Sequence, residues 1–178
     1  LVSAVLWLFL GNLRAAAIVA VTIPLALLAT FLGLTWIGIP ANLLSLGAMD
    51  FGIIVDGAVI VVENVFRHLS EANKVEHNMT EERRKHLILH AAMEVGRPTL
   101  FSMLIIIAAH IPIFTLQRHE GRIFSPMAYS VVSALIGALI LSLTLVPLLC
   151  SVALKRNLPE KENWIVLLAK RVYVPSLD

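Results

Sequence analysis

The chain has 178 residues, of which 58% are hydrophobic and only 15% are charged, and its mean hydropathy is +0.86. Soluble domains are about 45–50% apolar and about 25% charged, so this composition excludes a soluble globular domain and indicates an integral membrane protein. The net charge of +2 does not identify a ligand, and the single Cys150 excludes an internal disulfide.

Apolar runs predict membrane helices along the whole chain. The opening run, 1–10, is half as long as the roughly 20 residues that a crossing requires, and no initiator Met precedes it. We therefore interpret it as the end of a helix in a segment of a longer protein. A complete span is predicted at 15–36, with Pro24 as a kink that a membrane helix tolerates.

The remaining elements alternate between apolar spans and polar connections. They are, in chain order, a span at 43–66, a polar loop at 67–97 with a short amphipathic helix from Thr80, a span at 98–116, a tight loop at 117–123, a long span at 124–154 and an interfacial amphipathic helix at 158–174. The predicted fold class is therefore an all-α, polytopic transmembrane helix bundle.

The distribution of basic residues predicts the orientation of this bundle. Twelve of the 14 Lys and Arg residues fall in connections on one side, whereas the other side holds only Arg118 and Arg122. The positive-inside rule then places the long loop 67–97 and the C-terminal end in the cytoplasm.

Three acids lie within the apolar span 43–66: Asp50, Asp56 and Glu63. Each ionised carboxylate near mid-membrane costs about 2.5–3.5 kcal/mol on the insertion scale, so acids at this depth indicate a functional site. Asp56 and Glu63 are seven residues apart, on nearly the same helix face and about 10.5 Å apart along the axis, whereas Asp50 is rotated by about 120° from Asp56. This spacing is too long for a shared-proton pair but suits a path for protons.

Two further features of this span bear on the path. No Lys or Arg occurs in any apolar span, so a cationic partner for the acids is expected outside the sequence. Gly47, Gly52 and Gly57 recur every five residues and should let another helix approach closely.

Alternatives remain open at this point. The acids could be paired structural groups, or the bundle could be a channel or a purely structural assembly. Intramembrane aspartyl proteolysis also uses embedded acids, but on different helices. His86, His90 and Glu94 share a helix face and are either a solvated surface or a metal site, and His110 makes either a helix–helix hydrogen bond or a relay step.

Several ordered motifs resemble one transporter family over nearly the whole chain. They are GIPANLLSLGA, DFGIIVDGAVIVVEN, EVGRPTLFSMLIII, IPIFTLQRHEGRIFSPMA and LSLTLVPLLC. They are similar to the heavy-metal efflux branch of the resistance-nodulation-division (RND) transporters. The resemblance implies that the chain covers the end of transmembrane helix 2 through helix 6, followed by the interfacial helix.

The resemblance also implies a function. Asp56 would be the central proton-relay acid, flanked by Asp50 and Glu63, and their cationic partner a Lys in a second transmembrane half. The protein would be a secondary active transporter rather than an enzyme, without a cofactor, exchanging protons for heavy-metal cations in a bacterial inner membrane. Homotrimers joined to a periplasmic adaptor and an outer-membrane channel are implied as well.

The resemblance further bears on the metal. Copper and silver exporters of the family tend to carry Met near the central Asp, where this chain has Ile54 and Val61. We therefore expect divalent zinc, cobalt, cadmium or nickel, whose ligands are harder than thioethers. Monovalent copper or silver, or an organic substrate, is the alternative.

Overall fold

The structure is a computed structural model that describes residues 12–39, 51–75 and 79–154. Within these residues the fold is an all-α bundle, as the sequence predicts. The helices are α2 (Leu13–Ile37), α4 (Phe51–Val75), α5 (Glu81–Ala109), the short 3-10 helix η1 (Ile111–Thr115) and α6 (Arg118–Ala153). The predicted helix end at 1–10 and the interfacial helix at 158–174 lie outside the described residues.

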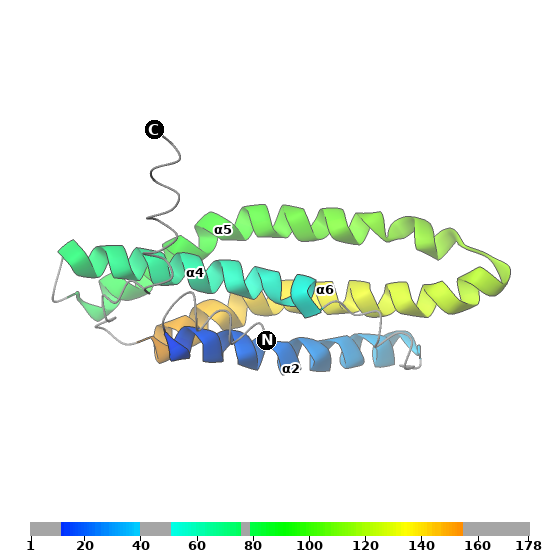
Figure 1. Ribbon diagram of the computed structural model, residues 1–178, viewed down its shortest axis with the longest axis horizontal. Coiled ribbons are helices and arrows are strands. Elements are labelled where there is room, and N and C mark those ends of the chain that lie inside the picture. Colours follow the sequence, from blue (N-terminus) through cyan, green and yellow to red (C-terminus); the bar gives the residue numbers. More distant parts are fainter. Residues whose placement is uncertain (1–11, 40–50, 76–78, 155–178) are drawn as a thin grey trace, which may run out of the picture.

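The four long helices run side by side, with α4 and α6 in the middle of the bundle (Figure 1). Each of these two helices contacts α2 on one side and α5 on the other. The start of α2, the end of α4, the start of α5 and the end of α6 lie at the same end of the bundle (Figure 1). The connections that are rich in Lys and Arg therefore gather at that end.

Three described helices are long and apolar enough to cross a membrane: α2, the continuous stretch Glu81–Thr115, and α6. Helix α4 is not among them, because the described helix begins only at Phe51 and its sequence becomes polar from Glu63 onwards. The first part of the predicted span 43–66 lies outside the described residues.

Helix α5 differs from the prediction, which separated a short loop helix from a span beginning at Pro98. The structure has one helix from Glu81 to Ala109 with Pro98 inside it. Proline removes one N–H from the helical ladder, but the next residue, Thr99, adds a bond from its hydroxyl to the Val95 carbonyl (2.7 Å). With 29 residues, α5 is about 43 Å long, so its polar first half extends beyond the hydrocarbon core, which is about 30 Å thick.

Two other helices are longer than the sequence predicts. Helix α4 continues to Val75, well past the predicted boundary at 66, and α6 begins at Arg118, inside the predicted loop 117–123. Gly121 permits this early start, because a Cβ at that position would overlap the carbonyl oxygen of Leu116. The turn from η1 into α6 is therefore tighter than a polar loop of seven residues.

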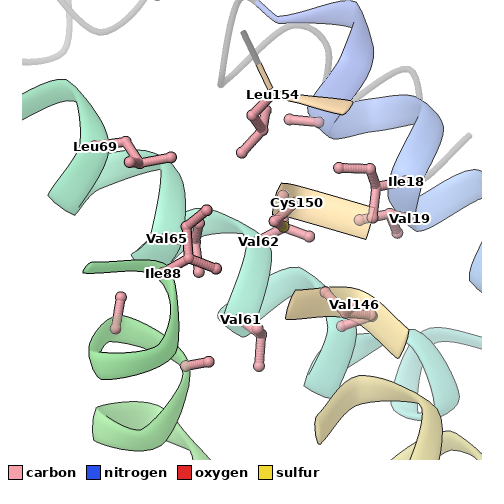
Figure 2. Packing of buried hydrophobic residues seen from close by; sticks show 14 of the residues in the cluster. Ile18, Val19, Val61, Val62, Val65, Leu69, Ile88, Val146, Cys150 and Leu154 are labelled. Carbon is pink, nitrogen blue, oxygen red and sulfur yellow. The ribbon is translucent and has the colours of Figure 1, made fainter. Parts of the chain in front are cut away.

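The buried core consists mainly of small and β-branched side chains. One cluster joins Ile18 and Val19 of α2 to the Val61, Val62 and Val65 side of α4 (Figure 2). Backbones approach closely where glycine occurs: a Cβ on Gly137 of α6 would lie 2.7 Å from the Cβ of Ala29 on α2. Small residues at such crossings bring helices together through van der Waals contact, the main attraction available in lipid.

Arg84 ties the first turn of α5 to the last turn of α6. Its side chain is almost entirely buried, and its guanidinium donates hydrogen bonds to the carbonyl oxygens of Ser151 (2.8 Å) and Leu154. Carbonyls at a helix C-terminus have no partner within their own helix, and a cation there also interacts favourably with the helix dipole. Arg84 thus closes the end of α6.

We expect Arg84→Met to weaken this end of the bundle, because the last carbonyls of α6 would be left buried without a donor. The free energy of unfolding should fall by about 1–3 kcal/mol. Thermal unfolding of the purified protein in detergent, followed by circular dichroism, measures the change. Lys85→Met removes a cation from the neighbouring exposed position and should have little effect; equal losses in both variants would contradict the role of Arg84.

Candidate functional site

Asp56 and Glu63 lie on a face of α4 that no other described helix covers. Both are exposed, as are Ile53 (37%) and Ile60 (41%), which lie on the same side of the helix. The opposite side is buried against the bundle. It consists of Val55, Ala58, Val62, Val65 and Leu69. Helix α4 therefore has an apolar face packed inside the bundle and an acid-bearing face directed away from it.

One uninterrupted helix carries both acids. Asp56 and Glu63 therefore lie on nearly the same helix face, about 10.5 Å apart along the axis, as predicted. Neither carboxylate has a hydrogen bond or ion pair with another described residue. Asp50, the third predicted relay acid, lies outside the described residues. The structure thus brings Asp56 and Glu63 onto one stripe and does not place Asp50.

Gly57 lies where α4 packs tightly against side chains of α5 and α6. A Cβ at this position would lie 2.7 Å from the Cε of Met103 and 3.2 Å from the Oγ of Ser142. Gly52 is exposed, and Gly47 lies outside the described residues. Of the three glycines predicted to allow close helix packing, Gly57 has such contacts within this bundle, and it is adjacent to Asp56.

A polar cluster joins α4 to α5 one residue after Glu63. The buried Asn64 donates from Nδ2 to the Ala91 carbonyl (2.9 Å) and to Glu94 Oε2 (3.1 Å), and its Oδ1 accepts from Arg67 Nη2 (2.9 Å). His68 donates from Nε2 to the same Glu94 oxygen (2.8 Å), because an ionised carboxylate can only accept. Helices α4 and α5 are thus joined by directional bonds at this level.

Comparison with known proteins covers the whole chain. Residues 1–178 match the model of the AcrB/AcrD/AcrF family. The chain belongs to this family. Among RND transporters of this kind it falls in the heavy-metal efflux branch, as the motifs predict.

Two relatives and one solved structure illustrate the similarity. The cobalt-zinc-cadmium resistance protein CzcA of Cupriavidus metallidurans is 50% identical over 181 residues, which is 100% of this chain and 17% of CzcA. The nickel-cobalt-cadmium resistance protein NccA of Alcaligenes xylosoxydans xylosoxydans is 43% identical, over 100% of this chain and 17% of NccA. A crystal structure of a heavy metal efflux pump matches with a TM-score of 0.71 and 46% identity, over 96% of this chain and 15% of that one.

The chain of this AcrB/AcrD/AcrF family member therefore spans about a sixth of the length of these relatives. Its four described long helices represent a part of the membrane region of a heavy-metal efflux protein. The described helices of this part leave the acid-bearing face of α4 uncovered.

The polar cluster was not foreseen from the sequence of this family member. Glu94 was expected on a solvated helix face or in a metal site with His86 and His90. His86, His90 and Glu94 are exposed, as a solvated face requires, and the Glu94 carboxylate in addition bonds to Asn64 and His68. No group of three potential metal ligands occurs among the described residues. The available signal was Asn64 itself, which interrupts the buried apolar face of α4.

His110 makes a bond that neither of its two predicted roles describes. Its Nδ1 bonds to the Ile106 carbonyl (2.8 Å) one turn earlier, at the C-terminal end of α5. This bond lies within one helix, and the described residues show no bond from His110 to another helix. The ring contributes instead to the end of α5, where the chain tightens into η1.

Glu94 lies before Pro98, in the polar first half of α5. Hydrogen bonds from Asn64 and His68 lower the pKa of its carboxyl below the ordinary value of a glutamate. A carboxyl whose pKa is lower in the folded state stabilises the fold above its unfolded pKa, and this contribution disappears as the pH falls through the folded pKa. Glu94→Gln should therefore lower the unfolding temperature near neutral pH, with a difference from wild type that shrinks below about pH 4.5. Melting curves in detergent between neutral pH and pH 3 measure it. Glu82→Gln, at an exposed position of α5, is the control, and a difference for Glu94→Gln that grows on acidification would contradict the assignment.

Proposed function

We propose that this chain is the proton-relay part of a transporter that exports divalent heavy-metal cations in exchange for protons. One observation carries the proposal: Asp56 and Glu63 share a single exposed stripe on α4, in a member of the heavy-metal efflux branch of its family. Intramembrane carboxylates are costly, and a path for protons gives them a use.

The chemistry of the stripe follows from its surroundings. A carboxyl in dry, apolar surroundings favours its neutral form, and the same carboxyl favours its ionised form when water or a cation reaches it. Asp56 lies deeper in the apolar sequence than Glu63, so it would respond most strongly to wetting. Alternation between these two states lets Asp56 take up a proton on one side of the membrane and release it on the other.

The charge distribution gives the orientation of the proposed proton path. By the positive-inside rule the end of the bundle with Arg14, Lys74 and Arg84 faces the cytoplasm. Protons would enter from the periplasmic side, neutralise Asp56 and leave past Glu63 toward the cytoplasm. Protonation changes the relative stability of two arrangements of α4, and that population shift would drive the cycle.

The acid-bearing face needs a partner from elsewhere in the protein. We infer that a second transmembrane half supplies a Lys opposite Asp56, and that metal capture occurs in periplasmic parts of the protein rather than on α4. A trimer, a periplasmic adaptor and an outer-membrane channel complete the proposed assembly in a bacterial inner membrane.

The proposed cargo is a divalent cation of the zinc, cobalt, cadmium or nickel kind. The relatives named above carry cobalt, zinc, cadmium and nickel in their names and are 50% and 43% identical to this chain. Ile54 and Val61, on either side of Asp56, offer no thioether, the ligand that suits monovalent copper.

Replacement of Asp56 by Asn should abolish coupling, because the amide cannot carry a proton. Proteoliposomes that hold the protein expressed from its complete reading frame should show metal-dependent proton flux reduced by about 100-fold or more. Ile60→Asn places the same amide one turn away on the same face and should retain most of the flux. Undiminished flux in Asp56→Asn would remove Asp56 from the mechanism.

Cells that express the protein should gain tolerance to divalent zinc, cobalt or cadmium more than to copper or silver, because harder metal ions do not require thioether ligands. Growth across a dilution series of each metal salt measures this, with cells that express Asp56→Asn as the uncoupled control. Protection against copper or silver alone would overturn the metal assignment.

A further inference from the structure

The side chains that fasten α4 to its neighbours differ along the helix. From Val55 to Val65 the buried side chains of α4 are mainly Val and Ala, whose contacts have no preferred direction. Within the described residues, the side-chain hydrogen bonds that join α4 to another helix come from Asn64 and His68, and both go to α5. Among the described residues, these side-chain bonds to α5 lie toward the C-terminal half of α4.

The attachment uses the full capacity of the Asn64 amide. Its two N–H groups donate to the Ala91 carbonyl and to Glu94, and its oxygen accepts from Arg67. Asn64 is only 6% exposed, so loss of one of these bonds would leave a buried polar group without a partner. This end of α4 therefore resists sliding or rotation relative to α5.

The charged and titratable groups around the Glu94 carboxylate come from both helices. On α4 they are Arg67 and His68; on α5, His90 lies edge-on to the His68 ring, with ring centroids 6.2 Å apart. Hydrogen bonds from Asn64 and His68 lower the pKa of Glu94, so its carboxylate is ionised at neutral pH and can accept both bonds.

Asp56 lies eight residues before Asn64, which is about 12 Å along the helix axis. If Asn64 stays in place, a tilt of α4 by about 5° moves the backbone at Asp56 by about 1 Å, whereas Glu63 hardly moves. The apolar face between them can accommodate such a tilt because it breaks no directional bond.

We propose that Asn64, His68 and Glu94 form an anchor, the α4–α5 anchor, about which α4 tilts when Asp56 gains or loses its proton. The proposal rests on the proposed relay function of Asp56 and adds positioning residues to it. The anchor holds the backbone of α4 at Glu63 nearly still and concentrates the movement at Asp56, where the proton binds.

A charge exchange within the anchor tests this role. Asn64→Asp places a second carboxylate against Glu94 and should disrupt the anchor. Asn64→Asp combined with Glu94→Gln restores the bond between positions 64 and 94 with donor and acceptor exchanged, but not the bond to the Ala91 carbonyl. In proteoliposomes that contain the protein from its complete reading frame, Asn64→Asp should lower the turnover of metal-driven proton flux by about 10- to 100-fold, the scale expected for a misplacement of about 1 Å. The metal KM should stay unchanged, and the double variant should recover much of the turnover.

Controls in the same experiment separate the anchor from the relay. Glu71→Gln removes a carboxylate from an exposed position near the same end of α4 and should leave turnover unchanged. Loss of flux in Asp56→Asn together with normal flux in Asn64→Asp would overturn the anchor and leave the relay intact. Normal flux in Asp56→Asn would overturn the relay.

Distances between spin labels test the tilt directly and do not depend on flux. One pair of labels, at the exposed Ile53 and Ile105, reports on the membrane part of α4 and α5, and a second pair, at the exposed Glu71 and His86, reports on the anchor end. In lipid nanodiscs, a change from pH 8 to pH 5 should alter the first distance and leave the second unchanged. Equal changes at both pairs, or no change at either, would overturn the proposal.

Discussion

The energetic cost of a carboxylate in an apolar helix governs the arrangement of the whole bundle. Helix α4 has to bury one face well enough to stay in place while its other face carries Asp56 and Glu63. The buried face achieves this with small apolar side chains, mainly Val and Ala, packed among three other helices, each of which belongs to a stretch long and apolar enough to cross a membrane. The acids are thereby held at a defined depth and angle without any direct bond to the rest of the described bundle.

Much of this arrangement is predictable from the sequence. Hydropathy locates α2 and α6, and the period of 3.6 residues places Asp56 and Glu63 on one face before any coordinates are considered. Local composition is less informative about helix ends. Pro98 and the polar stretch 117–123 are typical of helix boundaries. In the structure α5 continues through Pro98, where the Thr99 hydroxyl adds a bond to the Val95 carbonyl, and α6 already begins at Arg118.

The bonds between helices are the part that the sequence does not provide. The spacing of His86, His90 and Glu94 describes one helix in isolation, whereas the partners of Glu94 come from α4, about 26 to 30 residues earlier in the chain. Arg84 likewise looks like one cation in a charged run, yet it bonds to carbonyls 67 and 70 residues later. Such pairs depend on which helix faces meet, and helical periodicity alone does not determine that.

Pro98 gives α5 an uneven stiffness. Because proline has no N–H, the carbonyl of Glu94 lacks its usual helical donor, and a helix bends most easily at such a point. The side chain of the same Glu94 accepts two hydrogen bonds from α4. At Glu94 a missing backbone hydrogen bond within α5 thus coincides with side-chain hydrogen bonds to α4. The first half of α5 is thus fastened on two sides, to α4 through Glu94 and to the end of α6 through Arg84, before Pro98 interrupts its backbone ladder.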